Sequence, residues 1–317
     1  AAPTATPKPA EPTATPKPAF SESPMLAELV KAGKLPPVEQ RLPNDPMIIK
    51  PQDSVGKYGG TWRNVVAGAG DLPGWASRIN GAYLLFWEPD GVTVGPQLVS
   101  KWEVSGDGKA FTFYQRKGMK WSDGEPFTMA DIMYWYEDMA LNKEASPSFP
   151  GWLTIAKEPV KVEKIDDYSF KMSFAQPYGL LLLFMVNNAG MLAYPKHYFQ
   201  QFHPKYAKKE DLDKAVADAK FETWVQLHGN KNNGNTNPEL PVMTPYVVVK
   251  PLPDPTPVYD RNPYYWKVDT AGNQLPYIDH IRFTLVENVD LLNMKAIAGE
   301  IDASFRGISF TNYTLFK

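Results

Sequence analysis

The chain has 317 residues, a formal net charge of −2, 43% hydrophobic residues and no cysteine. That length allows two or more domains with sizeable cores, and the balanced charge gives no sign of binding to nucleic acid or to an anionic membrane surface. The chain contains no run of 18 apolar residues, so the sequence predicts no transmembrane helix. The absence of cysteine excludes thiol catalysis and is compatible with an oxidising compartment.

Residues 1–19 are of low complexity. The string PTATPKPA occupies residues 3–10 and again 12–19. Such a segment cannot bury a core and favours an extended polyproline II conformation, so it predicts a stiff spacer. One interpretation is a tether between a membrane anchor and a folded domain, and the other is a disordered tail without consequence. Because the chain lacks both an initial Met and a signal peptide, we expect a processed or trimmed form.

The first regular elements are a short helix over residues 24–34 and a strand over residues 61–66. Ser23 can cap the helix, Pro24 suits its first turn, and Gly33 ends it.

Two stretches follow this strand. Residues 68–75 are rich in glycine and predict a loop. Residues 79–87 form an apolar run that predicts a helix.

Residues 98–175 predict two hairpins around a helix. Residues 105–108 supply the positive φ angles of a hairpin turn, and a second hairpin over residues 160–174 turns at 166–167, with 168–174 as its outer strand. Between them, Thr128 predicts the cap of a helix over residues 129–142, with Asp131 completing a capping box.

The remaining segments are read from composition. Residues 180–186 are apolar on every side and predict a buried helix or strand. Residues 209–224 predict a helix with a polar face, and residues 230–238, rich in Asn and Gly, predict a loop.

Four sequence blocks carry a family resemblance. Residues 101–128 read KWEVSGDGKAFTFYQRKGMKWSDGEPFT, 245–250 read PYVVVK, 261–266 read RNPYYW and 299–302 read GEID. Together they resemble the family 5 extracellular solute-binding proteins, which are oligopeptide- and dipeptide-binding receptors of bacterial ABC importers. One position departs from the family pattern, because Thr244 stands where the family usually has glycine before PY.

The resemblance implies an α/β fold of the two-lobed periplasmic-binding-protein (Venus-flytrap) type, with an extra domain inserted in the first lobe. It covers about residues 35–317. In the family the GEID element lies near the crossing into the second lobe, so we expect that lobe to be largely missing here. The expected organisation is a tether over 1–19, the first part of lobe I over 20–97, the inserted domain over 98–175, and a return to lobe I over 176–317.

No motif predicts catalysis or a metal. The four His residues have no metal-ligand spacing, and neither a GxSxG nucleophile elbow nor a P-loop is present. Carboxylate pairs for glycoside hydrolysis are defined in space rather than in sequence. The adjacent pairs at 166–167 and 210–211 are better interpreted as a turn and a solvated helix end. We therefore expect no catalytic residue, no metal and no cofactor.

The candidate ligand-binding residues come from three places. By the resemblance, the loop at 71–75 and the segment at 304–306 face the cleft between the lobes, where Arg306 could clamp a carboxylate or form a surface salt bridge. Aromatic residues could line the cleft or simply pack in the core. The candidates are Asp71, Trp75, Tyr83, Phe149, Trp152, Phe305 and Arg306.

The predicted function is a receptor that captures a peptide-like solute outside the cell and delivers it to an ABC permease. An oligosaccharide receptor is the alternative within the family. A glycoside hydrolase or another surface enzyme, or an adhesin, is the alternative from a different class. We expect a monomer without nucleic-acid partners, on the outer side of the cytoplasmic membrane and lipid-anchored through a residue outside this chain.

Overall fold

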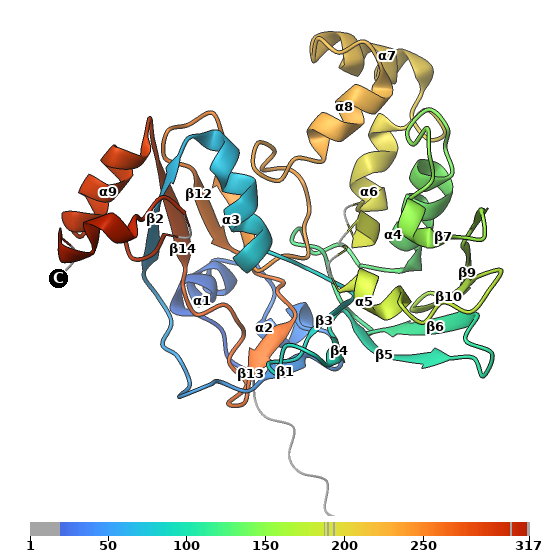
Figure 1. Ribbon diagram of the computed structural model, residues 1–317, viewed down its shortest axis with the longest axis horizontal. Coiled ribbons are helices and arrows are strands. Elements are labelled where there is room, and N and C mark those ends of the chain that lie inside the picture. Colours follow the sequence, from blue (N-terminus) through green and yellow to red (C-terminus); the bar gives the residue numbers. More distant parts are fainter. Residues whose placement is uncertain (1–19, 187, 189, 193, 305, 316–317) are drawn as a thin grey trace, which may run out of the picture.

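The computed structural model describes residues 20–186, 188, 190–192, 194–304 and 306–315, so the predicted spacer at 1–19 lies outside the described residues. Figure 1 shows two bodies side by side, one built around β2, β12 and β14 and the other around β5, β6, β9 and β10. None of the helices in these ranges combines the length and the apolar character that a bilayer crossing requires.

The helices and strands follow one another in mixed order along the chain. The helices are α1 (Pro24–Lys31), α2 (Val38–Arg41), α3 (Leu72–Ile79), α4 (Met129–Met133), α5 (Leu181–Met185), α6 (Lys196–Phe199), α7 (Lys209–Asp218), α8 (Trp224–Lys231) and α9 (Val289–Ile297). The strands are β1 (Met47–Ile49), β2 (Thr61–Ala67), β3 (Leu85–Trp87), β4 (Val94–Pro96), β5 (Val99–Val104), β6 (Ala110–Gln115), β7 (Thr154–Ile155), β8 (Glu158–Pro159), β9 (Lys161–Asp166), β10 (Ser169–Ser173), β11 (Tyr246–Lys250), β12 (Val258–Arg261), β13 (Lys267–Asp269) and β14 (His280–Val286). Short 3₁₀ turns are η1 (Ala69–Asp71), η3 (Gly151–Leu153), η4 (Gly190–Leu192), η5 (Gln200–Phe202) and η6 (Phe310–Leu315), and η2 (Tyr134–Ala140) is a π-helix.

The first body is a three-layer α/β/α unit. Its sheet has the order β11-β12-β14-β2, in which β2 and β14 pair in parallel over their whole lengths. Successive side chains of β2 point to opposite faces of the sheet, and both faces are covered by helices. Val66 lies in one core with Leu72 of α3, and Val65 lies in another with Leu292 of α9. The two helices therefore cover opposite faces of the sheet.

The second body is built on an antiparallel sheet of order β5-β6-β10-β9. Both predicted hairpins are confirmed, but β10 lies inside the sheet and β9 at its edge, so the prediction of 168–174 as the outer strand was wrong. Phe113 and Phe170 face each other across β6 and β10, with ring centroids 5.1 Å apart. Such cross-strand aromatic pairs stabilise a sheet face.

The helix that covers this sheet begins as predicted and continues differently. Thr128 caps α4 and Asp131 completes the capping box. After Met133 the chain widens into the π-helix η2, which a helical repeat in the sequence does not distinguish from an α-helix. All of η2 except Glu137 is buried.

Two predictions for residues 68–87 were wrong. The stretch 68–75 is not a loop, because it contains η1 and the first half of α3, and 79–87 is not a helix, because β3 pairs with β4 there. Pro73 is tolerated since it stands in the first turn of α3, where its missing N–H group has no partner to lose. Proline and glycine therefore predicted a loop where packing on the sheet stabilises a helix.

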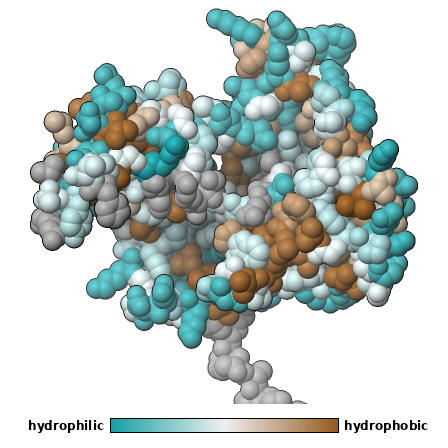
Figure 2. All heavy atoms as spheres, viewed as in Figure 1, coloured by the Kyte–Doolittle hydropathy of each residue, from teal (hydrophilic) through white to brown (hydrophobic). Residues whose placement is uncertain are grey.

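Helix α5 corrects the prediction for residues 180–186 in part. The segment is helical, but Leu181 and Met185 are buried whereas Leu183 and Phe184 remain 42% and 45% exposed. Exposed hydrophobic side chains gather on the face shown in Figure 2, and α5 packs beside β3, which adds exposed Phe86. We call Phe86, Leu180, Leu183 and Phe184 the α5 patch.

Helices α6, α7 and α8 pack around η2 in the second body. Tyr134 and Met139 of η2 share one core with Phe199, Leu212 and Leu227. A larger core joins residues from Ala82 to Trp266. Since cores of this extent cross the boundary expected at residue 175, the domain limits stay a prediction.

Candidate functional site

The candidate site lies at the carboxyl edge of the parallel strands β2 and β14. Both strands end at this edge, at Ala67 and Val286, and each leads into a helix that packs back on the sheet. In open α/β sheets, ligands bind outside the carboxyl ends of the strands.

A third segment reaches the same edge beside β2. Asn64 and Ala303 form a parallel bridge. The Arg63 guanidinium donates to both oxygens of the Asp302 carboxylate at 2.7 and 3.1 Å, and the backbone N–H of Arg63 donates to it at 2.8 Å. The same contacts hold the pKa of Asp302 below its usual value. This bidentate contact fixes the register of the returning segment against β2.

Asp71 and Arg306 meet at this edge. The bridge at 64 and 303 lies three residues before the end of β2 at Ala67, and Asp71 follows β2 in η1. The Arg306 Nη1 donates to Asp71 Oδ1 at 2.7 Å. The Arg306 side chain is 65% exposed and that of Asp71 is 22% exposed, so the pair stands at a solvent-facing rim. The sequence predicted both residues, and the structure brings them together.

The backbone around Asp71 differs from the prediction. We expected a loop with free backbone groups, whereas the segment is the start of α3. The N–H of Leu72 donates to the carbonyl of Ala69, and Pro73 has no N–H, so these two positions do not offer the free backbone donors that we expected. Trp75 belongs to α3, although the placement of its side chain is not described, and Phe305 lies outside the described residues.

The other three candidates are not part of this cluster. Tyr83 stacks on Phe86, with ring centroids 5.1 Å apart, in the segment that joins the two bodies. Phe149 meets Tyr136 edge-on at 6.4 Å, and Trp152 packs against the large core of the second body. Figure 1 shows β7, which follows Trp152, on the far side of the molecule from α3. For Phe149 and Trp152 the packing favours the core interpretation.

Sequence reasoning missed several polar residues near the first sheet. A cavity of about 190 Å³ lies between the end of α3 and strands β11 and β12. Asn80 there makes two hydrogen bonds to the backbone of Tyr246, at 2.9 and 3.1 Å. No local signal links residues 166 positions apart. Asp302 could have been found, because it belongs to the GEID element.

The adjacent carboxylates behave as turn and helix-end residues. Asp166 accepts the N–H of Tyr168 at 2.8 Å within the hairpin turn, and Lys164 pairs with Asp167 at 2.5 Å. Glu210 and Asp211 lie in the first turn of α7, where negative charge complements the helix dipole. Across the described ranges no three His, Asp or Glu side chains converge in a way that could hold a metal ion.

Comparison with known proteins gives a consistent result. Residues 93–314 match the family model "Bacterial extracellular solute-binding proteins, family 5 Middle". The periplasmic alpha-galactoside-binding protein of Rhizobium meliloti is 34% identical over 296 residues, which are 87% of this chain and 40% of that protein. The chain therefore spans well under half the length of this curated relative.

Two solved structures have the same architecture. One is described as the oligopeptide-binding protein OppA, with 43% identity and a TM-score of 0.88, covering 94% of this chain and 47% of that one. The other is the periplasmic binding protein MelB of Agrobacterium fabrum in complex with stachyose, with 32% identity and a TM-score of 0.72, covering 90% and 44%. This chain belongs to the bacterial extracellular solute-binding proteins of family 5.

Proposed function

We propose that this chain forms part of a receptor that captures an oligosaccharide outside the cell and delivers it to an ABC importer without chemical turnover. Membership of the solute-binding family supports capture, and the relatives compared above are named as binding proteins. The carboxyl edge of β2 and β14 provides one wall of the ligand site.

The observation that carries the ligand class is the ion pair of Arg306 with Asp71. Each charge at the rim already has a partner at 2.7 Å. A peptide carboxylate at Arg306 would meet the like charge of Asp71, and a peptide amine at Asp71 would meet the like charge of Arg306. A sugar hydroxyl can instead donate to the carboxylate and accept from the guanidinium while the pair stays together. Neutral hydroxylated ligands therefore match this edge better than zwitterionic ones.

The relatives support the same class. One is named for alpha-galactosides, and another was solved with stachyose bound. Peptides are the second candidate, favoured by the 43% identity to a structure described as oligopeptide-binding.

The remaining assignments follow from this function. We propose an ABC permease as the membrane partner, a monomeric receptor, and a location on the outer side of the cytoplasmic membrane with a lipid anchor. We also propose the domain organisation given above. Family membership supports the association with an ABC importer and the extracellular location.

The test is an NMR titration of the 317-residue chain with stachyose and, separately, with tetra-alanine. We expect stachyose to shift the backbone signals of Asp71 and Arg306, and Arg306→Ala to weaken binding about tenfold, since one charge-assisted hydrogen bond contributes about 1.5–3 kcal/mol. The matched control is Arg282→Ala, which removes an exposed arginine from the middle of β14. Shifts with tetra-alanine alone would select the peptide receptor, and equal losses in both variants would reject the site.

A further inference from the structure

The segment over residues 302–307 carries Arg306 to Asp71, and both of its ends are fixed by hydrogen bonds. At its start, the Arg63 guanidinium contacts the Asp302 carboxylate, and the backbone N–H of Asp302 donates to the Arg63 carbonyl at 2.9 Å. The Arg63 and Asp302 side chains are 40% and 38% exposed. Because an exposed ion pair is screened by water and salt, this contact alone holds the segment weakly.

The other end of the segment is held by a buried side chain of α9, the helix that lies against β2 and β14 in Figure 1. Asn293 is only 5% exposed. Its Nδ2 donates to the carbonyls of Gly307 at 2.8 Å and of Val289 at 2.7 Å, and its Oδ1 accepts from Asn312 at 3.2 Å. Burying an amide is unfavourable unless its hydrogen bonds are made, and here one of them leads out of the helix to the 302–307 segment.

Gly307 fits closely against the same helix. Its φ angle of 84° lies in the left-handed region that favours glycine. A Cβ atom at this position would lie 3.1 Å from the Leu292 side chain and 3.7 Å from that of Val289. Leu292 in turn packs in the core with Val65 of β2. The path of the segment is therefore determined by β2 at one end and by α9 at the other.

Arg306 depends on these two ends for its position. Its side chain is 65% exposed, so little packing around the guanidinium holds it. The Ser304 hydroxyl donates to the Arg306 carbonyl at 2.7 Å, which closes a turn just before the second fixed end. A long exposed side chain has many rotamers, so its contact with Asp71 is favourable only where the backbone presents it correctly.

We propose that Asp302 and Asn293 are positioning residues, which hold Arg306 against Asp71 before any ligand arrives. Neither residue needs to touch the ligand, because each fixes the backbone on one side of Arg306. A binding group that is already in place loses less conformational freedom on binding, so the two residues raise the affinity of the β2–β14 edge. This consequence for affinity rests on the proposed function, whereas the positioning of Arg306 does not.

The first measurement needs no ligand and follows the Arg306 Nε–H signal in ¹H–¹⁵N spectra of the 317-residue chain. Asp71→Asn weakens the ion pair and supplies the reference position of the signal. We expect Asp302→Asn and Asn293→Ala each to move the signal toward this reference. Asp302→Asn keeps the size of an exposed side chain, so it tests the proposal even if Asn293→Ala does not fold. A signal at the wild-type position in either folded variant would overturn the role of that residue.

The second measurement is the affinity for stachyose in the same variants. Each substitution should weaken binding about twofold to fivefold, which is less than the effect of Arg306→Ala. In the Arg306→Ala background neither should weaken it further, because both act through Arg306. Undiminished losses in that background would overturn the proposal. If the wild-type chain does not bind stachyose, the proposed function fails, and the Arg306 signal still decides whether the two residues position it.

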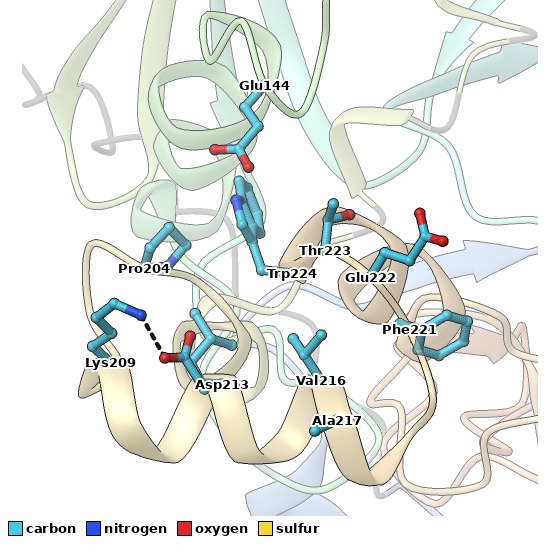
Figure 3. Close-up of a pocket in the computed structure, with 11 residues that line it drawn as sticks. Glu144, Pro204, Lys209, Asp213, Val216, Ala217, Phe221, Glu222, Thr223 and Trp224 are labelled. Carbon is cyan, nitrogen blue, oxygen red and sulfur yellow. Dashed lines mark hydrogen bonds and ion pairs between the residues drawn. The ribbon is translucent and has the colours of Figure 1, made fainter.

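Matched controls remove comparable contacts elsewhere. Asp213→Asn breaks an exposed ion pair with Lys209 on α7, which Figure 3 shows beside a cavity of the second body. Asn262→Ala removes a buried amide that, like Asn293, donates to two backbone carbonyls. Both should leave the Arg306 signal and the stachyose affinity unchanged. An Arg306 shift in these controls as large as in the test variants would overturn the proposal, since the signal would then report a general loss of structure.

Discussion

At the scale of single residues, His228 shows how burial sets chemistry in this fold. The ring is 1% exposed, stacks on Phe199 at 4.3 Å and shares a hydrogen bond with Tyr134. Desolvation, together with nearby His203, lowers the pKa of His228 to about 3. The ring is therefore neutral throughout the physiological range.

This burial predicts an acid-sensitive fold. The unfolded chain takes up a proton at His228 near pH 6.5, but the folded chain does so only near pH 3, so stability is present above pH 6.5 and is lost as the pH falls from 6.5 toward 3. One such group contributes a slope of about 1.4 kcal/mol per pH unit. His228→Gln should lower the free energy of unfolding at pH 7 by about 1–3 kcal/mol. It should also reduce the slope with which this free energy falls between pH 6.5 and pH 4.5, as measured by urea unfolding between pH 7 and pH 4.5.

His197 provides a control of opposite sign. Burial alone lowers its pKa, but the hydrogen bond to Asp123 at 2.7 Å and the charge of Asp123 raise it overall. A raised pKa stabilises the fold below the unfolded value of 6.5, and this stability is lost as the pH rises through the folded pKa. His197→Gln should therefore lower the stability by a constant amount below pH 6.5, leave the slope there unchanged, and abolish the loss of stability as the pH rises above 6.5. Flattening in both variants would show that neither effect comes from these rings.

The candidate site could be predicted from the sequence only as separate residues. Asp71 and Arg306 stood out through their places next to recognisable motifs, but their contact depends on the parallel bridge between Asn64 and Ala303. That bridge joins positions far apart in the chain, and no local pattern encodes it.

At the scale of elements, the sequence predicted helix starts and turns correctly where side chains next to the backbone determine them. The capping box at Thr128 satisfies the first N–H groups of α4, so this helix begins where predicted. The helix predicted over 209–224, however, ends at Asp218, and the capping box at Thr223 begins α8, which was not predicted. The hairpin at 105–108 also forms as predicted. Helix α3 was missed because its stability comes from packing Leu72 and Ile79 on the sheet, which outweighs the proline and glycine in its first turn.

The cap of α4 gives a quantitative prediction. Thr128→Ala removes the side-chain oxygen that accepts the N–H of Ala130, and should lower the free energy of unfolding by about 1 kcal/mol. Urea unfolding at pH 7 measures this change. Ser148→Ala, in an exposed loop outside any helix, is the control and should change stability by less than about 0.5 kcal/mol. Equal effects of the two substitutions would mean that the capping box contributes nothing.

The α5 patch predicts self-association of this chain. Leu183 and Phe184 expose apolar surface beside Phe86, and contiguous apolar patches on a monomer favour association. The double change Leu183→Ser and Phe184→Ser should shift the sedimentation profile toward monomer at high concentration, with little effect on the thermal midpoint. The control is Leu181→Ser at the buried side of α5, which should lower the midpoint instead. An unchanged profile of the double variant would show that the patch does not drive association.

At the scale of the whole molecule, the sheet of the first body joins strands from opposite ends of the chain. Strand β2 pairs with β14, more than two hundred residues later, and thereby brings η1 and the segment after Ala303 to one edge. The family resemblance anticipated an α/β fold, whereas composition and periodicity alone could not supply this pairing. Long-range strand pairing is what brings these scattered polar residues to one edge, which we propose as a wall of the ligand site.

Hydrogen exchange with and without stachyose tests this central claim most directly. The account predicts slower amide exchange at the start of α3 near Asp71 and around Arg306. At the same stachyose concentration, this slowing should be smaller in Arg306→Ala and unchanged in Arg282→Ala. Slower exchange confined to other parts of the chain, with the edge of β2 and β14 unchanged, would contradict the account.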